Sequence, residues 1–189
     1  MLGPAERSQI DRLWARKLDQ DLRKLGQAQR HRNLEPSSAA FLNVLATTLD
    51  AKRLVEIGGS SGISTIALAA AARATGGKLL SIEIEASRQA EARETLDSLD
   101  LSAHVELILG DAATVLPTLE AMPFTLIDCE KEDYIRFFDM LKLAPGSIVV
   151  ADNILSHDLS DYTRYVRSRP GIESMTLPIG KGLEITRIT

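Results

Sequence analysis

The sequence lacks the features that mark several protein classes. Its 189 residues include one cysteine, Cys129, which excludes an internal disulfide and a cysteine-based zinc site. No apolar run reaches the length of about 20 residues that a membrane-spanning helix needs. Residues 1–10 carry Pro4, Glu6 and Arg7, where a signal peptide would have an apolar centre. We therefore expect a cytoplasmic protein that does not span a membrane, with Cys129 in a packing role.

An excess of basic residues is also lacking. The 22 Lys and Arg are outnumbered by 26 Asp and Glu, which gives a formal net charge of -4 and a pI near 5.4. No basic stretch is interleaved with aromatic residues, so the chain has no electrostatic footprint for nucleic acid. We expect no nucleic-acid partner.

What the chain does contain is typical of a globular protein with one substantial core, because 44% of its residues are hydrophobic and 25% are charged. We divide it into an N-terminal amphipathic helix with a connector, residues 1–35, and a main domain, residues 36–189. The helix could pack on the core, cover a site or pair with a second subunit, and Gly26 ends it. Its apolar residues recur at three- and four-residue steps: Ile10, Leu13, Trp14, Leu18, Leu22 and Leu25.

A glycine-rich turn at residues 58–62 joins a short β-branched strand, residues 53–57, to an Ala-rich helix that starts at Ile63. Gly58 and Gly62 permit positive φ and close approach of a ligand to the backbone. The turn could equally join a strand to a helix without any ligand.

The same turn fits a serine-hydrolase elbow, Gly-x-Ser-x-Gly. Ser60 would be the nucleophile, with Asp128 or Asp152 and then His157 following in the required order. Only about fifty residues precede the turn, however, whereas several strands precede the elbow of an α/β-hydrolase. The nicotinamide fingerprint Gly-x-Gly-x-x-Gly is absent, because Ser60 stands at its third position.

Strand and helix patterns alternate along the rest of the chain. Alternating strands and helices imply right-handed crossovers and a parallel sheet that is covered on both faces. We predict an α/β, Rossmann-like doubly wound fold with a mostly parallel seven-stranded sheet, a C-terminal antiparallel hairpin and helices on both faces. The expected strands are residues 53–57, 78–83, 104–109, 124–128, 147–152, 172–177 and 182–188, and the expected later helices are 87–99, 112–119 and 132–143.

Polar residues end the strands of this predicted sheet. Ligands of such sheets bind beyond the carboxyl ends of the strands. Helix capping explains one or two of these residues but not all of them. Glu83 lies at the tip of the second strand, where its carboxylate can accept both hydroxyls of a ribose. The strand-end residues are Glu56, Glu83, Gly110, Asp111, Asp128, Asp152 and Asn153.

Several of these segments carry a family resemblance. Over about residues 36–188 the chain resembles the metal-dependent class I O-methyltransferases, and most of all the caffeoyl-CoA and catechol O-methyltransferase group with its small bacterial members. The segments are Glu56-Ile-Gly-Gly-Ser-Ser-Gly-Ile-Ser64, Ser81-Ile-Glu83, Gly110-Asp-Ala112, Phe124-Thr-Leu-Ile-Asp-Cys-Glu-Lys-Glu-Asp-Tyr134, Ala151-Asp-Asn153 and Leu177-Pro-Ile-Gly-Lys-Gly-Leu183.

This resemblance implies S-adenosylmethionine as the cofactor. Its methionine portion would be held by Gly58, Ser60 and Ser64, its ribose by Glu83, and its adenine edge by Asp111 with Ala112. Glu56, Gly62 and Asp128 complete the expected cofactor set.

The resemblance also implies a divalent metal bound by Asp128, Asp152 and Asn153, with Lys131 as general base. Two carboxylates and an amide oxygen suit Mg²⁺, or Ca²⁺ or Mn²⁺, rather than zinc. Such a site favours a chelating acceptor, and we expect a small aromatic diol. To take its proton, Lys131 must be neutral.

The sequence departs from the family pattern in two places, one near the amino end of the cofactor and one near the acceptor. Glu130 stands where members usually have Asp, and only residues 154–160 separate Asn153 from the next helix. The short loop leaves the use of a CoA ester open. We predict an O-methyltransferase that forms a homodimer. The alternative is a regulatory or vestigial protein that binds the cofactor without methylating a diol. His31, His104 and His157 are given no role.

Overall fold

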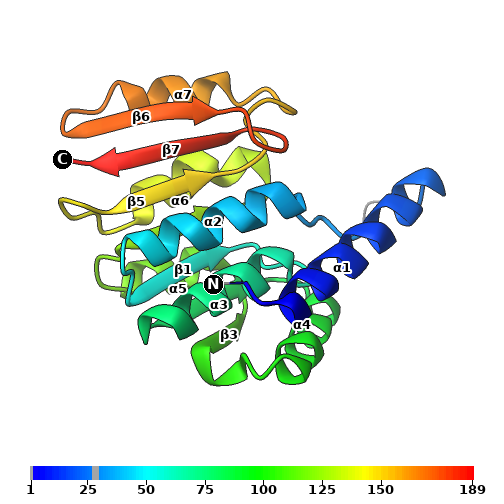
Figure 1. Ribbon diagram of the computed structural model, residues 1–189. Helices are drawn as coiled ribbons and strands as arrows, with labels where there is room; N and C mark the ends of the chain where they lie inside the picture. The colour runs from blue at the N-terminus through cyan, green and yellow to red at the C-terminus, as the bar shows by residue number, and fades with distance from the viewer. Residues whose placement is uncertain (1, 27–29) are drawn as a thin grey trace.

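The computed structural model describes residues 2–26 and 30–189, so part of the predicted connector, residues 27–29, lies outside the described residues (Figure 1). Within them the strands form one seven-stranded sheet in the order β3-β2-β1-β4-β5-β7-β6. The strands are β1 Arg53–Ile57, β2 Lys78–Glu83, β3 Val105–Leu109, β4 Phe124–Ile127, β5 Ile148–Ala151, β6 Ile172–Leu177 and β7 Leu183–Ile188. The α-helices are α1 Pro4–Leu22, α2 Pro36–Thr48, α3 Ile63–Thr75, α4 Ala86–Ser98, α5 Ala112–Val115, α6 Tyr134–Met140 and α7 Ser160–Arg167.

The sheet confirms the predicted fold class. Strands β1 to β5 are parallel, and β7 pairs antiparallel with both β5 and β6. Ile57 at the end of β1 is in register with Ile82 of β2 and Ile127 of β4, and Ile127 is in register with Ala151 of β5. The residues that follow these strands therefore meet at one edge of the sheet.

Two apolar clusters cover the two faces of the sheet. Leu42 of α2 and Leu68 of α3 belong to the first cluster, and Phe138 of α6 and Tyr162 of α7 belong to the second. Successive strand residues point to opposite faces, and adjacent β5 residues accordingly contribute to different clusters. The sheet thus has helices on both sides, as Figure 1 shows.

The N-terminal helix differs from its prediction. It begins at Pro4 and ends at Leu22, because Lys24 adopts a positive φ of 52°. Ile10 and Leu13 are buried in the first cluster, whereas Leu22 is 83% exposed. The first half of the apolar stripe therefore packs on the body, and the second half of α1 extends beyond it (Figure 1).

Three predicted elements are shorter in the structure because a 3-10 turn takes up part of each, and several other predicted ends differ by one residue. Helix α5 ends at Val115 because Pro117 cannot donate a backbone hydrogen bond, and a 3-10 turn replaces the rest of the predicted helix 112–119. Helix α6 is Tyr134–Met140 and follows a 3-10 turn at Lys131–Asp133, whereas the prediction was 132–143. His104 lies in a 3-10 turn before β3 rather than in the strand.

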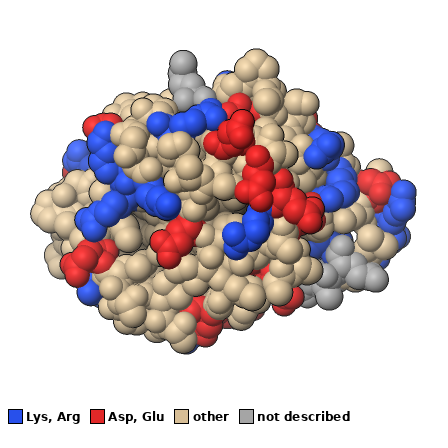
Figure 2. Space-filling model, turned by 90° about the horizontal axis from the view of Figure 1, so that it is seen from below, with Lys and Arg blue, Asp and Glu red and all other residues tan. Residues whose placement is uncertain are grey.

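No helix among residues 2–26 and 30–189 is long and apolar enough to cross a membrane. On the face in Figure 2, basic and acidic side chains adjoin one another.

Candidate active site

A cavity of about 420 Å³ opens at the carboxyl ends of the parallel strands. Of the site residues predicted from the sequence, eight line it: Gly58, Ser60, Glu83, Asp111, Ala112, Asp128, Lys131 and Asn153. The other four are buried behind the cavity wall and do not line the cavity. They are Glu56, Gly62, Ser64 and Asp152.

The glycine turn brings backbone close to the strand beside it. Gly58 has a φ of 92°, and a Cβ at this position would collide with the carbonyl oxygen of Asp128. Gly62 has a φ of 110° and is the N-cap of α3, while Ser60 has a φ of 47°. These positive φ values favour glycine and make Ser60 an unusual position. The turn therefore leaves room for a ligand against the backbone.

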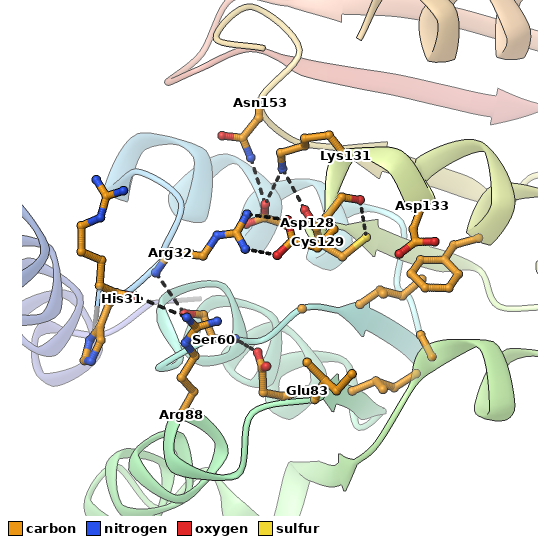
Figure 3. Close-up of a pocket in the computed structure, with 18 of the residues that line it drawn as sticks. His31, Arg32, Ser60, Glu83, Arg88, Asp128, Cys129, Lys131, Asp133 and Asn153 are labelled. Atoms are coloured by element: carbon orange, nitrogen blue, oxygen red, sulfur yellow. Dashed lines mark hydrogen bonds and ion pairs between the residues drawn. The ribbon is translucent and has the colours of Figure 1, made fainter. Parts of the chain in front are cut away.

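The carboxylate of Glu83 is held in place by two backbone amides. Oε2 accepts the N–H of Ser60 at 2.7 Å, and Oε1 accepts the N–H of Glu85 at 2.9 Å. Figure 3 shows Glu83 next to Ser60 on one side of the cavity. The carboxylate thus has a fixed orientation at the tip of β2 and retains further lone pairs for a ligand.

Glu56 supports the turn from beneath. Its Oε2 accepts hydrogen bonds from Ser81 Oγ at 2.6 Å and Thr65 Oγ1 at 2.7 Å, and its Oε1 has no hydrogen-bond partner among the described residues. Burial raises its pKa above the usual range. A Cβ on Gly59 would lie 3.1 Å from Glu56 Oε2. The geometry makes Glu56 a buried anchor of the turn.

Two carboxylates and one amide meet where β4 and β5 end. Asn153 Nδ2 lies 2.9 Å from Asp128 Oδ1 and 3.0 Å from Asp152 Oδ2. Asp152 Oδ1 is buried with no hydrogen-bond partner among the described residues. Burial, and next the charge of Asp128, raise the pKa of Asp152 to about 8, and burial also raises the pKa of Asp128. Two acids placed this close repel each other, and Lys131 Nζ, 3.5 Å from Asp128 Oδ1, offsets this repulsion only in part.

These residues fit a divalent cation. The buried oxygen of Asp152 lacks a partner, and the Asn153 amide oxygen and nitrogen are exchanged by a half-turn of the side chain. The set then offers three oxygen donors, which are the ligands of Mg²⁺, Ca²⁺ and Mn²⁺. No group of three or more His, Cys, Asp or Glu side chains is placed to hold a metal in the described part of the chain. A cation here would therefore depend on the amide.

Lys131 lies beside this cluster, and a tyrosine helps to hold it. Its Nζ donates to Tyr134 Oη at 2.7 Å and to the Cys129 carbonyl at 3.1 Å, and it lies 3.5 Å from Asp128 Oδ1. Tyr134 Oη in turn donates to the carbonyl of Asp152 at 3.1 Å. Figure 3 shows Lys131 and Asn153 both directed toward Asp128. The ammonium group is thus fixed next to the candidate cation site.

Sequence reasoning missed the ion pair between Arg32 and Glu130, which crosses the cavity. The guanidinium contacts both carboxylate oxygens, one of them at 3.1 Å, and the Arg32 N–H donates to Ser60 Oγ at 3.3 Å. His31 also lines the cavity, with Nδ1 at 3.0 Å from Ser61 Oγ. No local pattern signals these contacts, because the partners are far apart in the sequence.

The hydrolase arrangement is not assembled. Ser60 Oγ accepts the N–H of Arg32, and the ring of His157 contacts Ser156 Oγ at 3.0 Å. Among residues 2–26 and 30–189, no hydrogen bond connects Ser60 with a histidine. Ser60 therefore has no base.

The fold and the cavity define a Rossmann-like α/β protein that has a glycine turn after β1, an acid at the tip of β2 and a carboxylate cluster at the tips of β4 and β5. A sequence model described as O-methyltransferase matches residues 13–188, and the chain belongs to this family.

Two curated relatives are catechol O-methyltransferases. The protein from Niastella koreensis is 34% identical over 130 residues, which cover 65% of this chain and 58% of the relative. The protein from Mycobacterium tuberculosis is 35% identical over 119 residues, 61% of this chain and 54% of the relative. The chain thus spans little more than half the length of these relatives.

Solved structures share the fold. An O-methyltransferase from Bacillus cereus in complex with SAH has a TM-score of 0.80 at 20% identity, over 96% of this chain and 91% of that chain. An O-methyltransferase from Streptomyces achromogenes involved in tomaymycin synthesis, in complex with SAM, also has a TM-score of 0.80, at 21% identity over 100% and 91% of the two chains.

Proposed function

We propose that this protein is an S-adenosylmethionine-dependent O-methyltransferase that uses a divalent cation and acts on a small vicinal aromatic diol. One observation carries the proposal. The cluster of Asp128, Asp152 and Asn153 borders, through Asp128 and Asn153, the same cavity that Glu83 and the glycine turn line. A site for a hard cation and a site for a nucleoside thus adjoin.

The cofactor would lie between the glycine turn and β3. Gly58 and Ser60 would hold its methionine portion and Glu83 its ribose. Asp111 and Ala112 would contact the adenine edge. Asp111 caps α5 through Oδ1, which accepts the Ala113 N–H at 2.8 Å, and its second oxygen has no such role. The solved relatives with bound SAM and SAH support this choice of cofactor.

Three further residues of the predicted cofactor set act on the cofactor through the turn. Glu56 anchors the turn from beneath. Gly62 begins α3 with a positive φ, and Ser64 is buried in the first turn of that helix. We assign them to shaping the backbone around the methionine portion.

Asp128, Asp152 and Asn153 would hold the cation. A bound divalent ion supplies a Lewis acid, which lowers the pKa of a coordinated hydroxyl. Lys131 is the candidate general base. Its Nζ, held by Tyr134 Oη, would have to be in the neutral amine form to receive the acceptor's proton. A diol suits this site because its two oxygens can occupy adjacent positions on one cation.

The acceptor would enter near Asn153 and His157, which line the cavity beside Lys131. Helix α7 begins at Ser160, so the intervening loop is short, as the sequence indicated. The two catechol O-methyltransferase relatives support a catechol-like acceptor. A homodimer and a cytoplasmic location remain predictions.

The test is methylation of catechol with S-adenosylmethionine and Mg²⁺, with the methyl ether detected by mass spectrometry. We expect product that disappears with a chelator and returns with added Mg²⁺. Asp152→Ala should abolish turnover and leave the affinity for S-adenosylmethionine, measured by calorimetry, nearly unchanged. Turnover that persists with the chelator would contradict the metal part. Cofactor binding without methylation of any diol would favour a cofactor-binding protein of the same fold.

A further inference from the structure

The charged side chains that line the cavity have hydrogen-bond or ion-pair partners among the described residues, with one exception. Arg88 has no ion pair there but donates to the Arg30 carbonyl at 3.4 Å. Each acidic side chain that lines the cavity has a partner within the described residues, whether a cation, an amide or a backbone N–H. Lys17 and Arg30 pair with Asp21, and Arg32 pairs with Glu130. Lys181 is the exception. For its side chain there is no hydrogen bond or ion pair anywhere in residues 2–26 and 30–189.

The backbone around Lys181 is fixed. Its N–H donates to Glu35 Oε2 at 3.1 Å, and its carbonyl accepts the N–H of Leu155 at 2.8 Å. Gly180 has a φ of 57°, and a Cβ there would collide with Glu35 and Ser38. The β6–β7 loop is thus clamped between the start of α2 and the loop after Asn153. The backbone position of Lys181 is therefore fixed, while its long side chain can adopt different rotamers within the cavity.

Lys181 lies at the acceptor end of the cavity. Burial, followed by the charges of Lys131 and Lys181, lowers the pKa of His157. The β6–β7 loop contacts the loop after Asn153, because the N–H groups of Ile154 and Leu155 donate to the carbonyls of Gly182 and Lys181 at 3.0 and 2.8 Å. In the strand order this loop lies on the β5 side of the candidate cation site, away from β2 and Glu83. Glu35, an acid that contacts the β6–β7 loop, already accepts the backbone N–H of Lys181.

We propose that Lys181 binds an anionic substituent of the acceptor, so that the preferred substrates are vicinal aromatic diols that carry a carboxylate. This inference rests on the proposed function. The cofactor is not the expected partner, because the strand order places the β6–β7 loop beyond β5, on the far side of the cation site from the glycine turn and Glu83 that would hold the cofactor. A carboxylate held by an ammonium makes a charge-assisted hydrogen bond, and fixing the far end of the ring would orient the diol toward Asp128 and Asn153.

The experiment compares 3,4-dihydroxybenzoate with catechol, using wild type, Lys181→Met and Lys181→Arg, all with S-adenosylmethionine and Mg²⁺. We expect wild type to have a KM about 10- to 100-fold lower for the acid. Lys181→Met should remove the preference, so that the ratio of the two KM values falls to about one, while kcat for the acid changes little. Lys181→Arg should keep most of the preference. Lys142→Met, which removes a lysine outside the cavity, should change nothing.

Two results would overturn the inference while the proposed function stands. One is methylation of both diols by wild type without preference for the acid. The other is an equal loss for both diols in Lys181→Met, which would place the ammonium on the diol itself. If neither diol is methylated, the proposed function fails. In that case, 3,4-dihydroxybenzoate is titrated by calorimetry into wild type and into Lys181→Met, each with S-adenosylhomocysteine and Mg²⁺. Equal affinity for the two proteins, or binding to neither, rejects a carboxylate site at Lys181.

Discussion

Asn153 places its side-chain amide 2.9 Å from Asp128 Oδ1, although the two residues are 25 positions apart and follow different strands. The contact exists because β4 and β5 are parallel and in register, so that their carboxyl ends lie side by side. Asn153 also adopts a φ of 67°, a conformation that Asn tolerates better than most residues. The amide thus separates two acids that would otherwise face each other without a donor.

This arrangement predicts opposite effects of one substitution on stability and on metal binding. Asp152→Asn removes a buried carboxylate that has one unpartnered oxygen. With a chelator present we expect the free energy of unfolding at pH 7 to rise by about 1–3 kcal/mol. The pKa of about 8 means that folding must protonate this acid, a cost that Asn does not have. The stabilisation of wild type by Mg²⁺ should disappear in the variant. Thermal denaturation with and without Mg²⁺ measures both effects.

The surface variant Asp161→Asn is the control for this prediction. Asp161 pairs with Arg164 on the exposed side of α7, outside the cavity. Its stability should change by no more than about 0.5 kcal/mol, with the response to Mg²⁺ intact. A loss of stability in Asp152→Asn without metal would show that the carboxylate makes favourable interactions of its own.

A second prediction concerns the acid at the tip of β2. Glu83→Ala removes the acceptor for the N–H groups of Ser60 and Glu85 as well as the proposed ribose contact. We expect the affinity for S-adenosylmethionine to fall about 10- to 100-fold by isothermal calorimetry, because a charged hydrogen bond contributes about 1.5–3 kcal/mol. The control variant Glu85→Ala keeps the backbone N–H that Glu83 accepts, and it should bind S-adenosylmethionine with the affinity of the wild type. Unchanged affinity in Glu83→Ala would remove the ribose assignment.

The sequence predicts the sheet well because strand patterns are local. Residues 78–83 were predicted as a strand and form β2 with the same bounds. It predicts the turn at Lys131–Asp133 poorly, because the charged run resembles the first turn of a helix. Tertiary contacts decide there, and Lys131 is held by Tyr134. Arg32 and Glu130 are separated by 98 positions, so only the folded chain reveals their pairing.

Lys181 illustrates the same limit. Its segment belongs to the pattern that carries the family resemblance, yet nothing in the sequence distinguishes this lysine from a solvated one. Its position inside the cavity and its lack of a partner among the described residues emerge only from the fold.

A third prediction separates two reasons for glycine. Gly58 and Gly76 both have positive φ, 92° and 69°, but a Cβ at Gly76 would meet nothing within 4 Å, whereas at Gly58 it would collide with the carbonyl of Asp128. Gly76→Ala should therefore cost only the backbone strain, about 1 kcal/mol. Gly58→Ala should cost clearly more and displace β4. Urea denaturation of both variants measures the difference, and equal costs would argue against the close approach.

The last prediction rests on an ion pair between a buried acid, Glu184, and the half-exposed side chain of Arg167. Glu184 of β7 is fully buried and accepts Arg167 Nε and a terminal guanidinium nitrogen, both at 2.8 Å. Ser174 and Thr176 also donate to it, at 2.7 and 2.6 Å. Burial alone would raise the pKa of Glu184, but these hydrogen bonds and the charge of Arg167 outweigh burial and lower it.

A carboxylate with a lowered pKa contributes stability above the unfolded value of 4.5, and this contribution is lost as pH falls through the folded pKa. Arg167→Met leaves the charge of Glu184 buried without its cation, and we expect a loss of about 3 kcal/mol at pH 7. The loss should shrink as pH falls from 7 toward about 3, because the Glu184 carboxylate is protonated first in the variant, which lacks the cation, and only at lower pH in the wild type. Urea denaturation at the two pH values tests this. Arg164→Met, on the exposed side of α7 with Asp161, should cost less than about 0.5 kcal/mol at either pH, and a similar cost for the two variants would mean that Glu184 does not depend on Arg167.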